Sequence, residues 1–168
     1  MQTAEQEIII KQEEKKNEFK ELSTKENDEE KITNEVASKP TEVIATLEIP
    51  KINLNAQIAE GTTEEIMNSY IGHFDGTSLW NGNIGLAAHN RGYPVNYFRN
   101  IKELNIGDEI IYKVNGKEKI YTVQITTVIE DTDWSYLEFT EDNRITLITC
   151  VENEPNYRRC VQAVERDN

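Results

Sequence analysis

The chain has 168 residues, of which 37% are hydrophobic, and its 31 acidic and 18 basic residues give a formal net charge of -13. This length suits one domain with a tail, and the negative charge excludes nucleic acid as the main partner, because phosphate binding needs a basic patch. The printed sequence has no run near the about 18 apolar residues that a membrane span needs. We therefore expect a soluble chain or the soluble part of an anchored protein.

The first 40 residues differ in composition from the rest. They hold 11 acidic and 7 basic residues, no glycine and a single aromatic residue, Phe19. Such a segment cannot bury enough apolar surface to offset the conformational entropy of the chain. We expect a charged spacer over 1–40, either a frayed helix from about Glu5 to Leu22 or a disordered tether, followed by a folded domain over 41–168.

From Thr41 onward, short apolar segments alternate with turn residues. Apolar alternation predicts strands at 43–49 and 52–58, and Thr62 with Glu65 three residues later forms the capping box of a short helix. The remaining predicted elements are strands at 84–88, 109–114, 119–128, 144–150 and 158–164, a second helix within 94–104, a long loop at 129–143 and a turn-prone connection at 151–157. Asn115-Gly116 is a strong hairpin signal. Seven or eight short strands predict a mainly β protein, a closed or nearly closed barrel with one or two short helices.

Two residues at predicted strand ends carry the candidate chemistry. His89 follows the apolar run that ends at Ala88, and Cys150 ends the run that begins at Ile145. A rigid strand aims such side chains at an open rim, where a cysteine thiolate acts as the nucleophile and an imidazole handles its proton. Taken alone, Cys150 fits better a small buried hydrophobic residue, and a disulfide with Cys160 is a further alternative. Two cysteines are too few for a disulfide framework or a structural zinc site.

Two arginines begin the last predicted strand. If this strand pairs with the one that ends at Cys150, Arg158 lies near the thiol, and its guanidinium could donate hydrogen bonds to a developing oxyanion. Parity places Arg158 on one face with Cys160 and Arg159 on the other, more apolar face. The alternative is a pair of solvated arginines next to acidic neighbours. The other histidine of the chain, His73, is expected to pack or to be partly exposed.

These residues resemble the signature of sortases, the cysteine transpeptidases of Gram-positive cell surfaces. Thr146-Leu147-Ile148-Thr149-Cys150 is similar to the TLxTC motif of that family. The family also has a histidine at an upstream strand end, which His89 matches, and an arginine at the start of the final strand, which Arg158 matches. The resemblance covers about residues 43–166, and the three motifs in this order make it specific.

The resemblance implies an eight-stranded sortase-like barrel with a groove that ends at the cysteine, histidine and arginine. It implies cleavage of an LPxTG-like sorting signal between Thr and Gly through a thioacyl enzyme, followed by transfer to an amine of a cell-wall precursor such as lipid II. Cys150 would be the nucleophile, His89 would transfer protons and Arg158 would stabilise the oxyanion or the substrate. Thr149 would contact the substrate, and Trp134 would border its Leu-Pro end.

The resemblance also implies a location and a class. We expect the extracellular face of a Gram-positive cell membrane, with the anchor absent from this chain, and a monomer that needs no cofactor. No metal site can be assigned from the carboxylates in the sequence. The short 151–157 connection and the lack of an added lid resemble class D or class A sortases more than a pilin polymerase.

Two alternatives stay open. The first is another cysteine protease, although the order of His89 before Cys150 excludes the papain type, and Thr149-Cys150-Val151 lacks the glycine typical of a chymotrypsin-like nucleophile turn. The second is a non-catalytic β-barrel binding module of the cell surface, whose behaviour would not depend on Cys150. Thiol alkylation separates this binding module from a cysteine enzyme, because a reactive low-pKa thiol labels fast and a structural thiol does not.

Overall fold

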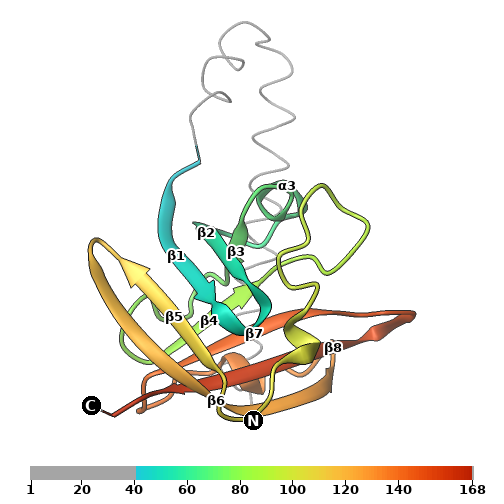
Figure 1. The fold of residues 1–168 in the computed structure, drawn as a ribbon. Helices are drawn as coiled ribbons and strands as arrows, with labels where there is room; N and C mark the ends of the chain where they lie inside the picture. Colours follow the sequence, from blue (N-terminus) through green and yellow to red (C-terminus); the bar gives the residue numbers. More distant parts are fainter. Residues whose placement is uncertain (1–40, 168) are drawn as a thin grey trace, which may run out of the picture. The chain divides into compact units, whose positions relative to one another are not determined.

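The structure, a computed structural model, describes residues 41–167, so the expectations for the spacer at 1–40 lie outside the described residues. Within the described part, one short α-helix, α3 (Glu64–Met67), and three 3-10 turns, η2 (Pro50–Ile52), η3 (Ile101–Glu103) and η4 (Ser135–Leu137), join eight strands. The strands are β1 (Val43–Ile49), β2 (Leu54–Glu60), β3 (Ile71–His73), β4 (Asn83–Ala87), β5 (Glu109–Val114), β6 (Lys117–Glu130), β7 (Arg144–Val151) and β8 (Glu154–Glu165). The predicted mainly β barrel is confirmed (Figure 1).

The eight strands close into one barrel in the order β1-β2-β3-β4-β7-β8-β6-β5. Most neighbours are antiparallel, but β2 pairs with β3, and β4 with β7, in parallel. Figure 1 shows the long strands β6 and β8 running side by side, in agreement with their register. The parallel pair β4–β7 is the feature that matters for the site, because it brings two strand ends from distant parts of the chain to the same end of the barrel.

Alternating apolar side chains fill the barrel interior. In β1, every second residue from Ala45 to Ile49 is buried, as the sequence pattern predicts. The interior cluster draws on nearly every strand and contains Leu47, Ile49, Ile58, Ile71, Ile84, Leu86, Ile110, Tyr112, Tyr121, Val123, Ile145, Leu147 and Val161, among others. Closure of the sheet leaves no unpaired edge along this core.

A second apolar cluster lies on the outer face of the sheet. Ile148 and Cys160 are register partners on β7 and β8, while their neighbours Leu147 and Val161 point into the barrel. The outer cluster consists of Phe74, Ala87, Ile129, Leu137, Ile148 and Cys160, with Met67, Trp134 and Tyr136 packed against it. Gly85 allows this packing, because a Cβ there would come within 2.7 Å of Leu137 and 3.0 Å of Thr77.

The helix predicted within 94–104 is wrong. Only η3 forms there, and turns fill the rest of the segment. Phe98, Ile101 and Leu104 are nevertheless buried in the interior cluster. Their spacing of three residues fits a 3-10 turn as well as an α-helix, and the turn before them is fixed by an asparagine side chain described below. No helix in the described residues is long and apolar enough to cross a membrane.

Other predicted boundaries shift. The strand β3 was not predicted, because three residues show no alternation, and the predicted strand at 52–58 begins later because Asn53 adopts a positive φ of 53° after η2. The predicted loop at 129–143 contains the end of β6 and η4. The predicted connection at 151–157 is mostly strand, since Val151 pairs with Glu154 and leaves a two-residue turn in which Asn153 has a φ of 63°.

Candidate active site

His89 and Cys150 come from neighbouring parallel strands. In the register of β4 with β7, Ala87 lies beside Ile148, and the Ala88 N–H continues the pairing by donating to the Ile148 carbonyl at 3.4 Å. His89 and Cys150 each follow two residues later, so they reach the same end of the barrel. Because residues two apart on a strand point to one face, Cys150 belongs with Ile148 to the outer face that carries the apolar cluster, and His89 lies two residues beyond Ala87 of the same cluster.

The third predicted residue lies on the next strand. The register of β7 with β8 places Arg158 directly opposite Cys150 and Arg159 opposite Thr149. Arg158 is therefore on the outer face with the thiol, and Arg159 is on the other face. Both arginines are half-buried. The structure thus brings Cys150, His89 and Arg158 together on three adjacent strands, while their catalytic roles stay predictions.

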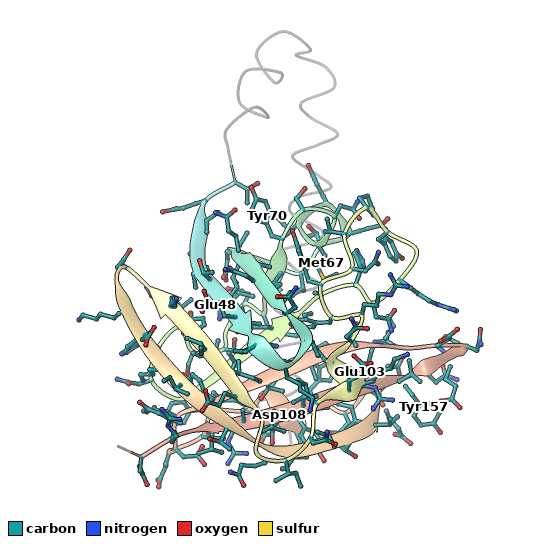
Figure 2. The ribbon with its side chains drawn as sticks, in the orientation of Figure 1. Glu48, Met67, Tyr70, Glu103, Asp108 and Tyr157 are labelled. Atoms are coloured by element: carbon teal, nitrogen blue, oxygen red, sulfur yellow. The ribbon has the colours of Figure 1, made fainter. Side chains whose placement is uncertain are left out.

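The guanidinium of Arg158 is held at the edge of the β7–β8 hairpin. Its Nη1 donates to the carbonyls of Pro155 and Tyr157 at 2.9 and 2.8 Å. Figure 2 labels Tyr157 near the projecting end of β8, away from β5 and the tip of the β5–β6 hairpin. These two bonds fix one end of the guanidinium and leave Nε and Nη2 as the groups that could donate to a substrate.

The two cysteines have opposite surroundings on the same face. Cys150 is exposed, Cys160 is fully buried, and both thiols are free, so the disulfide alternative is not formed in this structure. Burial raises the pKa of the Cys160 thiol to about 12, with Asp133 adding to the effect. A thiol that resists ionisation is a poor nucleophile, so Cys150 is the better candidate of the two.

The imidazole of His89 is buried, and one of its ring nitrogens has no hydrogen-bond partner among the described residues. The residue is 8% exposed, and that nitrogen is Nε2. Burial lowers its pKa, and the negative charge of Glu64 opposes this in part. The neutral imidazole is thus favoured over the imidazolium. A neutral imidazole keeps one ring nitrogen able to accept a proton.

Residues that directly follow His89 tie the two sides of the site together. The Asn90 side chain donates from Nδ2 to the Cys150 carbonyl at 2.6 Å. Arg91 forms an ion pair with Glu152 at 2.5 Å and contacts Asn153 Oδ1 at 3.4 Å. The turn after β4 is thereby bonded to the tip of the β7–β8 hairpin. Sequence reasoning missed these contacts, and the only available signal was the position of polar Asn90 and Arg91 immediately beyond the histidine.

A buried polar network fixes the segment 131–139, which we call the wall segment, onto the outer face. The Asn83 side chain donates to the carbonyls of Tyr136 and Glu138 at 2.8 and 2.9 Å and accepts from the Thr146 hydroxyl at 2.7 Å. The Gln162 amide donates to the Tyr136 carbonyl and to Thr146 Oγ1, both at 3.1 Å. The predicted long loop is thus held in place beside the outer apolar cluster.

The two predicted substrate-binding residues lie in different places. Trp134 is in the wall segment and packs edge-on against Phe74, with ring centroids 6.1 Å apart. Thr149 is buried, and its hydroxyl donates to the Ala88 carbonyl at 2.7 Å. The Trp134 ring therefore packs on the outer apolar cluster, whereas the Thr149 hydroxyl bonds the backbone just after β4.

Comparison with known proteins agrees with this arrangement of strands. The family model of the sortase domain matches residues 47–166 of the chain, which include all three candidate residues. The chain belongs to the sortase family. The expected fold and family are thereby confirmed.

Curated relatives give this sortase domain a context. Sortase A of Bacillus anthracis is 29% identical over 123 residues, which cover 73% of this chain and 59% of that protein. Sortase D of Bacillus subtilis (strain 168) is 29% identical over 135 residues, covering 77% of this chain and 66% of that protein. The chain thus spans about three fifths of the length of the first curated relatives it matches.

Solved structures share the fold of this sortase domain. A lid mutant of sortase A from Corynebacterium diphtheriae superposes with a TM-score of 0.72 at 25% identity, covering 79% of this chain and 74% of that one. Sortase C-1 from Streptococcus pneumoniae gives 0.71 at 26% identity, covering 76% and 68%. Sortases of different classes are therefore similar to this chain, and the likeness does not select one class.

The other histidine of the sortase domain has a structural position. His73, in β3, is buried, with Nδ1 2.6 Å from a Glu60 carboxylate oxygen. Its Nε2 lies 2.8 Å from the Ser78 carbonyl and 3.0 Å from Thr77 Oγ1. Both nitrogens are engaged, which agrees with the expectation that His73 packs. In the described part of the chain, no three His, Cys, Asp or Glu side chains group as metal ligands.

Proposed function

We propose that this protein is a sortase-type cysteine transpeptidase that cleaves an LPxTG-like sorting signal between Thr and Gly and transfers the new carboxyl end to an amine. The observation that carries the proposal is the convergence of Cys150, His89 and Arg158 on adjacent strands at one end of the barrel, in a chain of the sortase family. Each residue type suits one task in acyl transfer through a thioester.

In the first step, the Sγ atom of Cys150 attacks the carbonyl carbon of the scissile Thr-Gly bond. The thiol proton passes to Nε2 of His89, which has no partner among the described residues, and then to the departing glycine amine. A C–S bond forms and the C–N bond breaks, giving a thioacyl enzyme. Arg158 donates from Nε and Nη2 to the oxygen on which negative charge develops, so it acts mainly in the transition state.

In the second step, an acceptor amine attacks the thioester carbonyl. His89 takes the proton of the amine, the new C–N bond replaces the C–S bond, and Cys150 leaves with its proton restored. One peptide bond is exchanged for another, so the reaction needs no oxidant, reductant or cofactor. We place the acceptor on a cell-wall precursor of the lipid II type, as the resemblance to sortases implies.

The outer apolar cluster supports a binding path for the sorting signal. It leads along β7 and β8 from the wall segment to Cys150, with Trp134 on the side of the wall segment and Ile148 on the floor. Met67, the last residue of α3 and labelled in Figure 2, packs on the same cluster. An apolar surface beside a nucleophile suits the Leu-Pro part of the signal, and Trp134 would border it.

We also propose that the enzyme works as a monomer on the extracellular face of a Gram-positive cell. This location is the one in which cell-wall precursors and sorting signals meet. It rests on family membership and on relatives from Bacillus and Listeria.

The decisive experiment incubates the full chain with a panel of quenched-fluorescence sorting-signal peptides and with an oligoglycine or diamine acceptor. Mass spectrometry should find cleavage after Thr, a thioacyl adduct on Cys150, and a product joined to the amine. Cys150→Ala should abolish all three, while the matched control Cys160→Ala should keep most of the activity, because Cys160 is buried away from the solvent.

Each other outcome selects an alternative. Cleavage without transfer at any amine concentration would indicate a cysteine protease. Peptide binding without cleavage, unchanged in Cys150→Ala, would indicate a non-catalytic binding module. Equal loss in Cys150→Ala and Cys160→Ala, with the fold intact, would contradict Cys150 as the sole nucleophile.

A further inference from the structure

An aromatic ring covers the candidate histidine. The rings of Tyr93 and His89 stack with centroids 3.5 Å apart and planes 5° from parallel. His89 is nearly inaccessible to water, while Tyr93 itself is 43% exposed. Tyr93 therefore lies on the outside of the stack, as a cover over the imidazole.

The segment that holds Tyr93 is a closed turn. Residues 89–98, which we call the mouth turn, are joined at their ends by the Phe98 N–H donating to the His89 carbonyl at 3.0 Å. Within the turn, the Asn96 side chain accepts from the Tyr93 N–H at 3.3 Å and donates to the Tyr93 carbonyl at 2.8 Å. Both backbone groups of Tyr93 are thus fixed by one side chain, which sets the position of its ring.

The groups around His89 come from several elements. Glu64 of α3 is the charge that acts on the imidazole. Cys150 on β7 and Arg158 on β8 lie on the same face. The Arg91–Glu152 ion pair joins the mouth turn to the tip of the β7–β8 hairpin. None of these groups is a planar cover for the ring, so the stack with Tyr93 is a separate constraint on the imidazole.

The geometry points to Tyr93 as a positioning residue for the reaction: its ring fixes the plane of the His89 imidazole beside Cys150 and keeps water from it. This inference rests on the proposed function, because it assigns Tyr93 a part in the proton transfer that His89 performs. The stack restricts rotation of the imidazole ring, so the ring keeps one orientation during the proposed proton transfer. Exclusion of water favours the neutral form of the ring, which is the form that accepts the thiol proton.

Three variants separate the parts of this inference. Tyr93→Phe keeps the ring and removes only the hydroxyl, so it should behave like the wild type. Tyr93→Ala removes the cover, and Asn96→Ala removes the side chain that holds it. Ile106→Ala is the matched control, because it removes another exposed apolar side chain, one that is 71% exposed and lies before β5, outside both the wall segment and the mouth turn.

The first measurement does not depend on activity. The sequence has two histidines, so proton NMR can follow the imidazole signals of His89 and His73 separately during a pH titration of the full chain. Tyr93→Ala should raise the pKa of His89 toward the ordinary histidine value, because water then stabilises the imidazolium. The His73 signals should match those of the wild type, and Tyr93→Phe and Ile106→Ala should leave the signals of both histidines unchanged.

The second measurement is the rate of peptide cleavage. Loss of the stack should lower kcat by about 10-fold in Tyr93→Ala, a part of the roughly 10²–10⁴ that a positioned acid–base group contributes, with little change in KM. Asn96→Ala should show a smaller loss in the same direction. Tyr93→Phe should restore kcat to the wild-type value.

Two results would overturn the inference. An unchanged His89 titration in Tyr93→Ala would show that the ring does not set the state of the imidazole. A rise in KM with kcat unchanged would show that Tyr93 binds peptide and does not act through His89. If the wild type itself neither cleaves nor transfers, the proposed function fails, while the NMR titration still decides whether Tyr93 controls His89.

Discussion

The wall segment and the mouth turn flank the same three candidate residues, but different interactions hold them. The wall segment is bonded to Asn83, Thr146 and Gln162, all of which are buried. The mouth turn is bonded to the hairpin by Asn90 and Arg91 through more exposed contacts. A buried hydrogen bond is costly to lose, because its partner is left unsatisfied, whereas an exposed bond is replaced by water. Loss of the bonds of the wall segment should therefore mainly lower the free energy of unfolding, and loss of the bonds of the mouth turn should mainly lower kcat.

After Cys150, the largest effect on rate should come from Arg158, which lies on β8 opposite the nucleophile. Arg158→Ala should lower turnover by roughly 10²–10³, as the loss of one oxyanion donor typically does, with a smaller change in KM. Arg158→Lys should recover little, because a point charge cannot replace a fork of donors. Arg159→Ala is the matched control and should stay within a few-fold (an estimate from its place on the other face) in the same cleavage assay. A dead Arg159→Ala with an active Arg158→Ala would reverse the assignment.

The wall should show the largest effect on stability. Asn83→Ala removes one acceptor and two donors from a buried network, and each unsatisfied partner costs about 1–3 kcal/mol. We expect a loss of about 2–4 kcal/mol in the free energy of unfolding, measured by urea denaturation. Thr140→Ala, at a half-buried position after the wall segment whose hydroxyl donates one exposed hydrogen bond to the Asp142 carbonyl, is the control and should lose less stability. An unfolding free energy equal to the wild type in Asn83→Ala would contradict the role of the network.

A smaller effect is expected at Asn90, where a substitution should lower kcat more than the free energy of unfolding. Its side chain bonds the carbonyl of the candidate nucleophile, so Asn90→Ala should let the β7–β8 hairpin shift relative to His89. We expect kcat to fall about 5-fold while the unfolding free energy falls by no more than about 1 kcal/mol, the net value of one hydrogen bond. Parallel denaturation and cleavage assays measure the two quantities. A stability loss with unchanged kcat would place Asn90 with the wall instead.

The smallest effect is expected for the exposed ion pair. Arg91 and Glu152 are each more than half exposed in their side chains, and such pairs contribute about 0–1 kcal/mol. Arg91→Ala should therefore leave the unfolding free energy nearly unchanged and lower kcat less than Asn90→Ala does. Any difference from the wild type should shrink at high salt, because the charges are screened. A salt-insensitive loss as large as that of Asn90→Ala would mean that Arg91 acts by another contact.

Much of the barrel could be predicted from the sequence, because its signals are local. Alternation in β1 and the Asn115-Gly116 turn both specify structure within a few residues, and the structure has β5 and β6 joined there, with positive φ at both turn positions. The candidate residues came from the TLITC motif and its upstream histidine. Their proximity is set by the parallel pairing of β4 with β7, which a motif can indicate only through family resemblance.

The incorrect helix prediction and the contacts that were not predicted have physical causes in common. The helix predicted within 94–104 failed because apolar residues three apart fit a 3-10 turn equally well, and because Asn96 bonds the backbone of Tyr93 in a turn. The contacts of Asn83 with Thr146 join positions 63 residues apart, and no local pattern reveals them. The stack of Tyr93 on His89 depends on the shape of the mouth turn. Because a helix was expected over part of this turn, the sequence did not indicate the stack.

The parallel pairing of β4 with β7 also determines the stage of folding at which Cys150 comes close to His89. Cys150 and Arg158 meet through a tight hairpin, a local event that forms early. His89 is 61 residues before Cys150 and reaches it only when the chain between them has folded and the barrel has closed. Contacts of such sequence separation form late, because they must first overcome the entropy of closing a long loop. A newly made or unfolded chain therefore carries an unassisted cysteine, and the chemistry switches on only with the completed fold.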